Sequence, residues 1–124
     1  MADARTVRRI AMSLPEAHDG SSPESLQFSV RGKQFAWTYQ ERLEKNKPRR
    51  PRLDVLAVRV LATEKDALLA GDPDKFFTTD HYRGYPAILV RLGKVDANEL
   101  RELLTDAWRC QAPRPLVKEF DATR

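Results

Sequence analysis

The sequence predicts an α+β domain of two layers, in which an antiparallel sheet carries an N-terminal and a C-terminal helix on one face. Apolar residues recur at helical spacing near both ends of the chain, whereas they alternate with polar residues in its middle. Short turns separate the alternating segments, and strands joined in this way pair antiparallel. Such a sheet buries one face under helices. Because 124 residues leave no room for a second core, we expect residues 1–113 to form this single domain and residues 114–124 to be a flexible tail.

Three helices are expected, over residues 3–14, 63–71 and 96–111. Asp3 is a residue type that caps helix N-termini, and Pro15 ends the first pattern. Each long helix has one apolar face. These faces comprise Val7, Ile10, Ala11 and Leu14 in the first helix, and Leu100, Leu103, Leu104, Ala107 and Trp108 in the last.

Four main strands are expected, over residues 26–30, 35–39, 53–60 and 87–92, with Gly32 turning the first into the second. Side chains alternate between the two faces of a strand. The face toward the helices should hold Leu26, Phe28, Val30, Leu56, Val58, Val60, Ile88, Val90 and Leu92. The opposite face, which we expect to be uncovered, should hold Gln27, Ser29, Arg31, Arg59 and Arg91.

The excess of basic residues is concentrated in one loop. The chain has 22 lysines and arginines against 18 aspartates and glutamates, a net charge of +4. Residues 41–52 carry six bases and two acids, so the remainder of the chain is balanced. A local basic patch attracts phosphates, although a solvated loop in an arginine-rich chain has the same composition. The residues that we expect to contact nucleic acid are Arg31, Lys33, Lys45, Lys47, Arg49, Arg50, Arg52, Arg59 and Arg91.

The segment 76–86 gathers several reactive side-chain types in one connection between strands. His81 beside Asp80 could act as a general base, and Arg83 could hold a carboxylate or a phosphate. The alternative is a structural turn, whose aromatic residues complete the core and whose Gly84 supplies an unusual backbone angle. No residue is assigned a catalytic role, because neighbours in sequence do not establish a reaction geometry. As a ligand pocket, the connection should be lined by Trp37, His81, Tyr82, Arg83 and Tyr85.

The strand over residues 35–39 carries three aromatic rings at alternate positions, Phe35, Trp37 and Tyr39. Aromatic side chains beside basic residues are typical of platforms on which single-stranded nucleic acids stack their bases. Core packing is the competing interpretation for at least two of the three, because their orientation depends on how Gly32 is used in the hairpin.

Several classes of function find no support. One cysteine and two distant histidines cannot complete a zinc site of the usual kind, and the five glycines are too scattered for a phosphate-binding loop. We therefore expect no metal and no cofactor. No apolar run approaches the roughly 18 residues of a membrane span, so no membrane partner is expected. The single Cys110 and an N-terminus without a signal peptide's long apolar stretch predict a cytoplasmic protein.

Five segments follow one another along nearly the whole chain: VRRIAMSLPEA at 7–17, RGKQFAW at 31–37, LAVRV at 56–60, FFTTDHYRGYPAILVRL at 76–92 and DAWRCQAPRPL at 106–116. Together they resemble the MmcQ/YjbR family of small bacterial proteins. The resemblance implies an α+β fold similar to that of CyaY and frataxin, and DNA binding through a double-wing arrangement in which the loop 45–52 would be one wing. Iron binding of the frataxin kind would need an acidic first helix, whereas this one carries Arg5, Arg8 and Arg9.

Three hypotheses of function follow. The first is a non-enzymatic DNA-binding protein that makes weak, sequence-tolerant contacts to phosphates through the basic loop and the open sheet face. The second is a small-molecule anion-binding protein or enzyme with a pocket around residues 81–85. The third is a protein-interaction adaptor whose bare sheet face binds an acidic partner or a second copy. Under the first hypothesis, the partner is nucleic acid, DNA before RNA, and the chain is a monomer or a weak homodimer.

Overall fold

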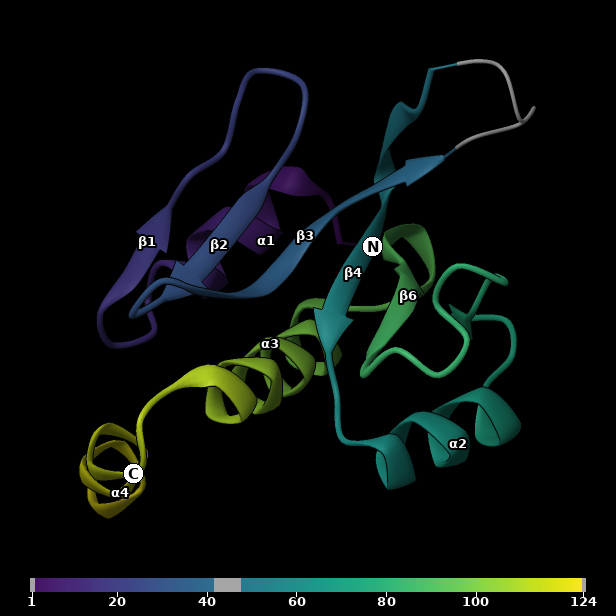
Figure 1. Ribbon diagram of the computed structural model, residues 1–124. Helices are drawn as coiled ribbons and strands as arrows, with labels where there is room; N and C mark the ends of the chain where they lie inside the picture. Colours follow the sequence, from purple (N-terminus) through teal and green to yellow (C-terminus); the bar gives the residue numbers. More distant parts are fainter. Residues whose placement is uncertain (1, 42–47, 124) are drawn as a thin grey trace.

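A computed structural model describes residues 2–41 and 48–123 (Figure 1). Its centre is an antiparallel sheet with the strand order β1-β2-β3-β4-β6-β5, as the sequence predicts for the class of fold. No helix within the described residues is long and apolar enough to cross a membrane. The strands are β1 (Ala17–Asp19), β2 (Gln27–Val30), β3 (Lys33–Glu41), β4 (Arg50–Arg59), β5 (Phe76–Phe77) and β6 (Ala87–Arg91). The helices are α1 (Ala4–Ala11), α2 (Ala62–Gly71), the 3-10 turn η1 (Leu92–Lys94), α3 (Ala97–Gln111) and α4 (Arg114–Ala122).

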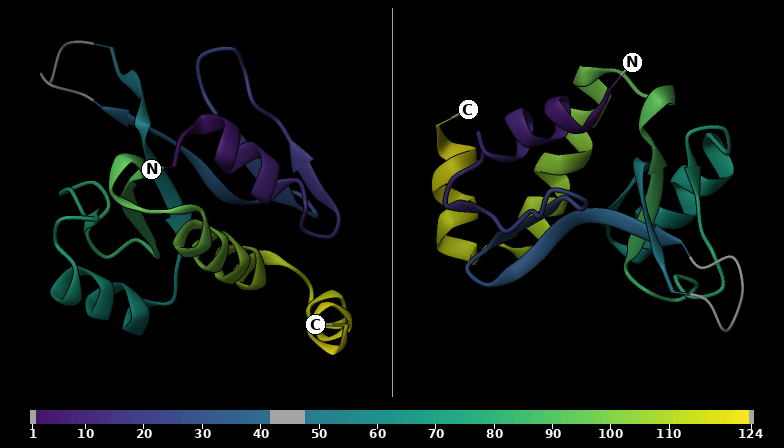
Figure 2. Two further views of the ribbon diagram at one scale, coloured as in Figure 1. Left: turned by 180° about the vertical axis from the view of Figure 1, so that it is seen from behind. Right: turned by 90° about the horizontal axis from the view of Figure 1, so that it is seen from above.

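Helices α1 and α3 lie together on one face of the sheet, as Figure 2 shows from behind. Each begins at an aspartate: Asp3 accepts a hydrogen bond from the backbone N–H of Thr6 at 3.0 Å, and Asp96 from that of Glu99 at 2.8 Å. All nine strand residues predicted to face the helices are buried in the main core. The indole of Trp108 on α3 is fully buried and donates to the carbonyl of Pro15 at 2.9 Å, which fixes the end of α1 against α3.

A β-bulge interrupts the expected alternation of β3. Phe28 of β2 pairs with Ala36, whereas Ser29 pairs with Gln34, so Phe35 is an extra residue in β3. As a result, Phe35 and Ala36 both point into the main core, and Trp37 lies on the opposite face. Alternation alone would have kept Phe35 and Trp37 on one face.

The opposite face of the sheet is covered at its centre, which corrects the expectation of an open face. Residues 78–86, which connect β5 to β6, fold back over it, and Tyr82 of this connection is 9% exposed. The DNA-binding and adaptor hypotheses both relied on an open face, and both lose that support at the centre of the sheet. The buried members of this second core are Val55, Ala57, Tyr82, Ala87 and Leu89, with Trp37, Tyr39 and Phe77 packed against them.

Three elements differ from their predictions. Helix α2 begins at Ala62, one residue before its expected start, and has no side-chain cap at Leu61. Strand β1 lies between the first expected helix and the first expected strand, where it pairs with β2. The expected flexible tail instead contains α4, and the centroid of its Phe120 ring lies 5.0 Å from that of Trp108. Leu116, Val117 and Phe120 of α4 pack against the main core.

Candidate functional site

Four aromatic rings form a row across the second face of the sheet. The centroids of Tyr85 and Tyr82 lie 6.0 Å apart, those of Tyr82 and Tyr39 also 6.0 Å, and those of Tyr39 and Phe77 6.4 Å. Every one of these contacts is edge-to-face, the arrangement that the ring quadrupoles favour. The row joins β3, β5 and the 78–86 connection, and we call these four residues the aromatic row.

An arginine lies against each end of the aromatic row. The guanidinium carbon of Arg59 is 5.3 Å from the ring centroid of Tyr85, and that of Arg91 is 4.2 Å from the centroid of Phe77. Both distances are within the range of cation–π attraction. Arg91 also donates to the backbone carbonyls of Pro73 and Asp74 at 3.1 and 3.2 Å, which holds its side chain in place. Tyr82 is buried at the centre of the row and Tyr85 is exposed at one end, so the row is a packed aromatic cluster with positive charge at both ends.

A buried lysine holds the connection onto the sheet. Lys65 on α2 is 7% exposed, and its Nζ donates to the carbonyls of Tyr82 at 2.6 Å and Tyr85 at 2.8 Å. Burial lowers the pKa of this amine, and the negative charge of Asp66 opposes the shift only in part. Sequence analysis missed Lys65, because a lysine in the first half of a helix is ordinarily solvated.

Trp37 and Tyr82 meet through a hydrogen bond between their polar atoms. The indole Nε1 of Trp37 donates to the Tyr82 hydroxyl at 3.1 Å. Burial raises the pKa of the Tyr82 phenol above its ordinary value, although the bond from Trp37 favours the phenolate. The positive charge of Arg49 also lowers this pKa, by less than burial raises it.

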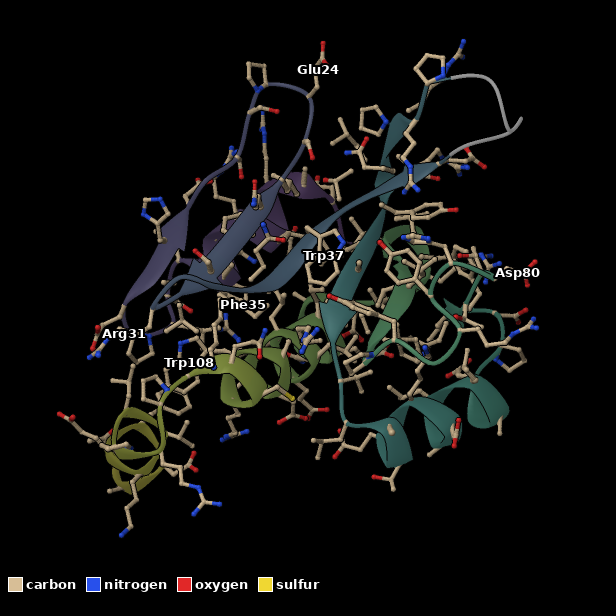
Figure 3. The ribbon with its side chains drawn as sticks, in the orientation of Figure 1. Glu24, Arg31, Phe35, Trp37, Asp80 and Trp108 are labelled. Carbon is tan, nitrogen blue, oxygen red and sulfur yellow. The ribbon has the colours of Figure 1, made fainter. Side chains whose placement is uncertain are left out.

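A cavity of about 310 Å³ opens beside Tyr85, lined by Gln34, Trp37, His81, Tyr82 and Tyr85. It brings together four of the five residues predicted to line a pocket. The fifth, Arg83, is outside the lining and makes an ion pair with Asp80 at 3.2 Å, where its side chain is 76% exposed. Figure 3 shows Asp80 at the edge of the molecule and Trp37 over the middle of the sheet.

Two of the predicted nucleic-acid contacts are neutralised by acids. Arg31 makes a two-pronged ion pair with Glu16, with one contact at 3.0 Å, and this contact lowers the pKa of Glu16. Arg52 bridges Glu41 at 3.0 Å and Asp54 at 2.7 Å. Hydrogen bonds from Arg52 lower the pKa of Asp54, which keeps that carboxyl ionised. Neither arginine presents a free positive charge.

The other predicted contacts are divided among separate places. Lys33 begins β3, and Arg50 of β4 pairs with Glu41 at the other end of β3. An extended strand of this length separates its two ends by about 26 Å. Arg49 and Arg50 are exposed, and Arg59 and Arg91 flank the aromatic row. Lys45 and Lys47 lie outside the described residues. Arg31 lies far from the connection that carries Asp80, as the labels in Figure 3 make visible.

Two further cavities adjoin the site. One, of about 590 Å³, lies beyond the Tyr39 and Phe77 end of the row and includes Arg91, Lys94 and Thr79 in its lining. Within the described part of the chain, the buried Thr79 hydroxyl has no hydrogen-bond partner. The other, of about 530 Å³, lies between α2 and α3. Its rim is acidic, with Glu64, Asp72, Glu99, Glu102 and Asp106 among the lining residues.

The five segments singled out in the sequence lie on the elements that build this site and the helices behind it. A model of the YjbR family matches residues 12–110, which include the whole aromatic row and both of its arginines. The chain belongs to the YjbR family. This confirms the resemblance found in the sequence.

Individual proteins extend the comparison. Uncharacterized proteins of Mycobacterium bovis and Mycobacterium tuberculosis are 48% identical over 71 residues, a match that covers 56% of this chain and 55% of each relative. The chain thus spans about half the length of these relatives. The crystal structure of the Deinococcus radiodurans protein DR2400, with a domain of the family DUF419, superposes with a TM-score of 0.64 at 22% identity. It covers 87% of this chain and 77% of that one, which confirms the predicted α+β fold.

Proposed function

We propose that this YjbR-family protein binds nucleic acid through the aromatic row and the basic side chains around it. The observation that carries the proposal is the row itself: rings at successive distances of 6.0 to 6.4 Å, with Arg59 against one end and Arg91 against the other. Aromatic rings offer faces and edges to bases, and guanidinium groups contact phosphates. The combination is typical of surfaces that bind nucleic acids without reading their sequence.

The charges around the row support this choice of surface. Within the described residues, Arg59 and Arg91 make no ion pair with a carboxylate, in contrast to Arg31 and Arg52. A base that is already paired gains little from a phosphate, because it must first lose its acid. We therefore assign the main phosphate contacts to Arg59, Arg91 and Arg49, and secondary contacts to Lys33 and Arg50.

The proposal includes no reaction. His81, the imidazole beside the row, contacts the ring of Tyr82 at 5.6 Å between centroids, an aromatic contact and not the pairing of a base with a nucleophile. Contacts to phosphates position a protein without reading sequence, so we expect weak affinity that is tolerant of sequence. A cytoplasmic location and a monomer or weak homodimer are part of the same proposal.

Fluorescence anisotropy with a labelled oligonucleotide tests this function. We expect binding at 50 mM salt that weakens steeply as salt rises, with a log–log slope of about −3 to −4 if about four phosphates are neutralised. Arg59→Gln should weaken binding and flatten that slope. Lys118→Gln on the exposed surface of α4 is the matched control, because it removes one positive charge away from the row. Absence of binding at 50 mM salt, or equal effects of the two variants, would overturn the proposal.

A second candidate function rests on the cavity of about 590 Å³ at the other end of the row. Arg91 and Lys94 line this cavity and could hold an anion there, whereas its other charged residues, Glu41, Arg52 and Asp54, pair with one another. This arrangement favours a small phosphorylated or carboxylated molecule. A thermal-shift screen of nucleotides and organic acids tests this function. A ligand that raises the melting temperature of the wild type but not of Lys94→Gln supports it, and a screen in which no compound raises the melting temperature would overturn it.

A further inference from the structure

We infer that the nucleic acid bound by this site is single-stranded, and that the cavity beside Tyr85 takes one unpaired base. The inference rests on the proposed function and specifies its ligand. It is carried by the cavity of about 310 Å³ whose lining residues are Gln34, Trp37, His81, Tyr82 and Tyr85. A space of this size accommodates a flat heteroaromatic group, and four of the five lining residues carry aromatic rings.

A single strand and a duplex differ in whether a protein can reach the faces of their bases. In a duplex, the faces of each base are stacked on its neighbours, and a protein reaches only the base edges through the grooves. Aromatic side chains can stack only on bases that are unpaired and splayed out. A duplex would therefore contact the arginines, whereas a single strand can also place a base against the exposed Tyr85 ring.

The Tyr85 ring is both accessible and fixed. Tyr85 is 44% exposed, although its carbonyl is held by Lys65 at 2.8 Å and its ring lies edge-on to Trp37 at 6.4 Å. An exposed ring that is already held in place loses little freedom when a base stacks on it. Arg59 lies against the same ring, where it can contact the phosphate next to the stacked base.

Three ligands of equal length separate the contributions of bases and phosphates: a single-stranded oligonucleotide, its duplex, and a single strand in which every base is removed. We measure their affinities by anisotropy at low salt. The inference predicts that the intact single strand binds roughly ten-fold more tightly than the abasic strand, since one stacked base contributes a factor of that size. Tyr85→Ala should remove most of this difference, and Tyr85→Phe should retain it.

The outcomes distinguish the inference from the function on which it rests. If the duplex and the abasic strand bind as tightly as the intact single strand, and Tyr85→Ala has no effect, the inference is wrong although the protein still binds nucleic acid. No binding of any of the three ligands would overturn both. The comparison of ligands uses the unaltered protein, so its result does not depend on a variant that folds poorly. Melting temperatures check that the Tyr85 variants remain folded.

Discussion

The indole nitrogen of Trp37 lies 3.1 Å from the phenolic oxygen of Tyr82, although 45 positions separate the two residues in the chain. Trp37 comes from β3 and Tyr82 from the connection that covers it. Their hydrogen bond, together with the two from Lys65, attaches this connection to the sheet from both sides. The aromatic row exists because of these attachments: without them, Tyr82 and Tyr85 would leave Tyr39 and Phe77 on an open sheet.

Tyr82→Phe should lower the free energy of unfolding by about 1 kcal/mol, because the indole N–H of Trp37 loses its acceptor. Urea denaturation measures the change. The matched control is Tyr85→Phe, which removes a hydroxyl from an exposed tyrosine of the same connection. It should lower the free energy of unfolding clearly less than Tyr82→Phe does. Equal losses in the two variants would mean that the bond to Trp37 contributes nothing to stability.

The buried Tyr82 phenol makes stability depend on alkaline pH. Its pKa in the folded protein is raised above the ordinary value of 10.0, first of all by burial. Below that pH, the phenol is protonated in both states and its contribution to stability is constant. At higher pH, the unfolded state loses the proton before the folded state does, so the free energy of unfolding falls. Wild type should therefore lose stability more steeply above pH 10 than Tyr82→Phe, and parallel pH profiles would contradict this account.

Lys65→Met should destabilise the protein by about 2 kcal/mol, since two carbonyls lose a charged donor. Hydrogen exchange of residues 78–86 should also become faster, because the connection loses its attachment to α2. Lys118→Met on the exposed surface of α4 is the control, and we expect it to change neither quantity. Unchanged exchange in Lys65→Met would show that the hydrogen bond from Trp37 suffices to hold the connection.

Release of a neutralised arginine should strengthen nucleic-acid binding. In the double variant Glu41→Gln and Asp54→Asn, Arg52 loses both acids that pair with it near the Tyr39 end of the row. We expect tighter binding and a log–log salt slope steeper by about 0.7 to 0.9, the value of one further phosphate contact. Asp106→Asn frees Arg109 on α3 in part and should leave the slope unchanged. An equal gain in both variants would point to a general effect of net charge.

Helices α1, α2 and α3, and the alternation of the strands other than β3, could be predicted from sequence because local rules determine them. Asp3 and Asp96 are helix caps by residue type, and both cap in the structure. The strand residues predicted to face the helices do so, because alternation follows from the geometry of a strand. These properties depend on a few neighbouring residues, which a single sequence displays.

Most of what builds the site depends on contacts between distant residues, and no local pattern encodes them. The bulge at Phe35 turned Trp37 away from the main core, and only the pairing of β2 with β3 reveals it. The partners of Arg31 and Arg52, and the carbonyls that hold Lys65, are likewise brought together only by the fold. The residue types at the 81–85 connection did indicate a pocket, although Arg83 lies outside it.

Nuclear magnetic resonance mapping is the most direct test of the surface assigned to nucleic acid. The backbone and indole resonances are recorded while an unlabelled single-stranded oligonucleotide is added. We predict that the largest shifts occur at the Trp37 indole and at residues 81–85, with smaller shifts at Arg59 and Arg91. Shifts concentrated instead around Arg31 and Lys33, or in the groove between α2 and α3, with Trp37 unaffected, would contradict the assignment of the aromatic row as the binding surface.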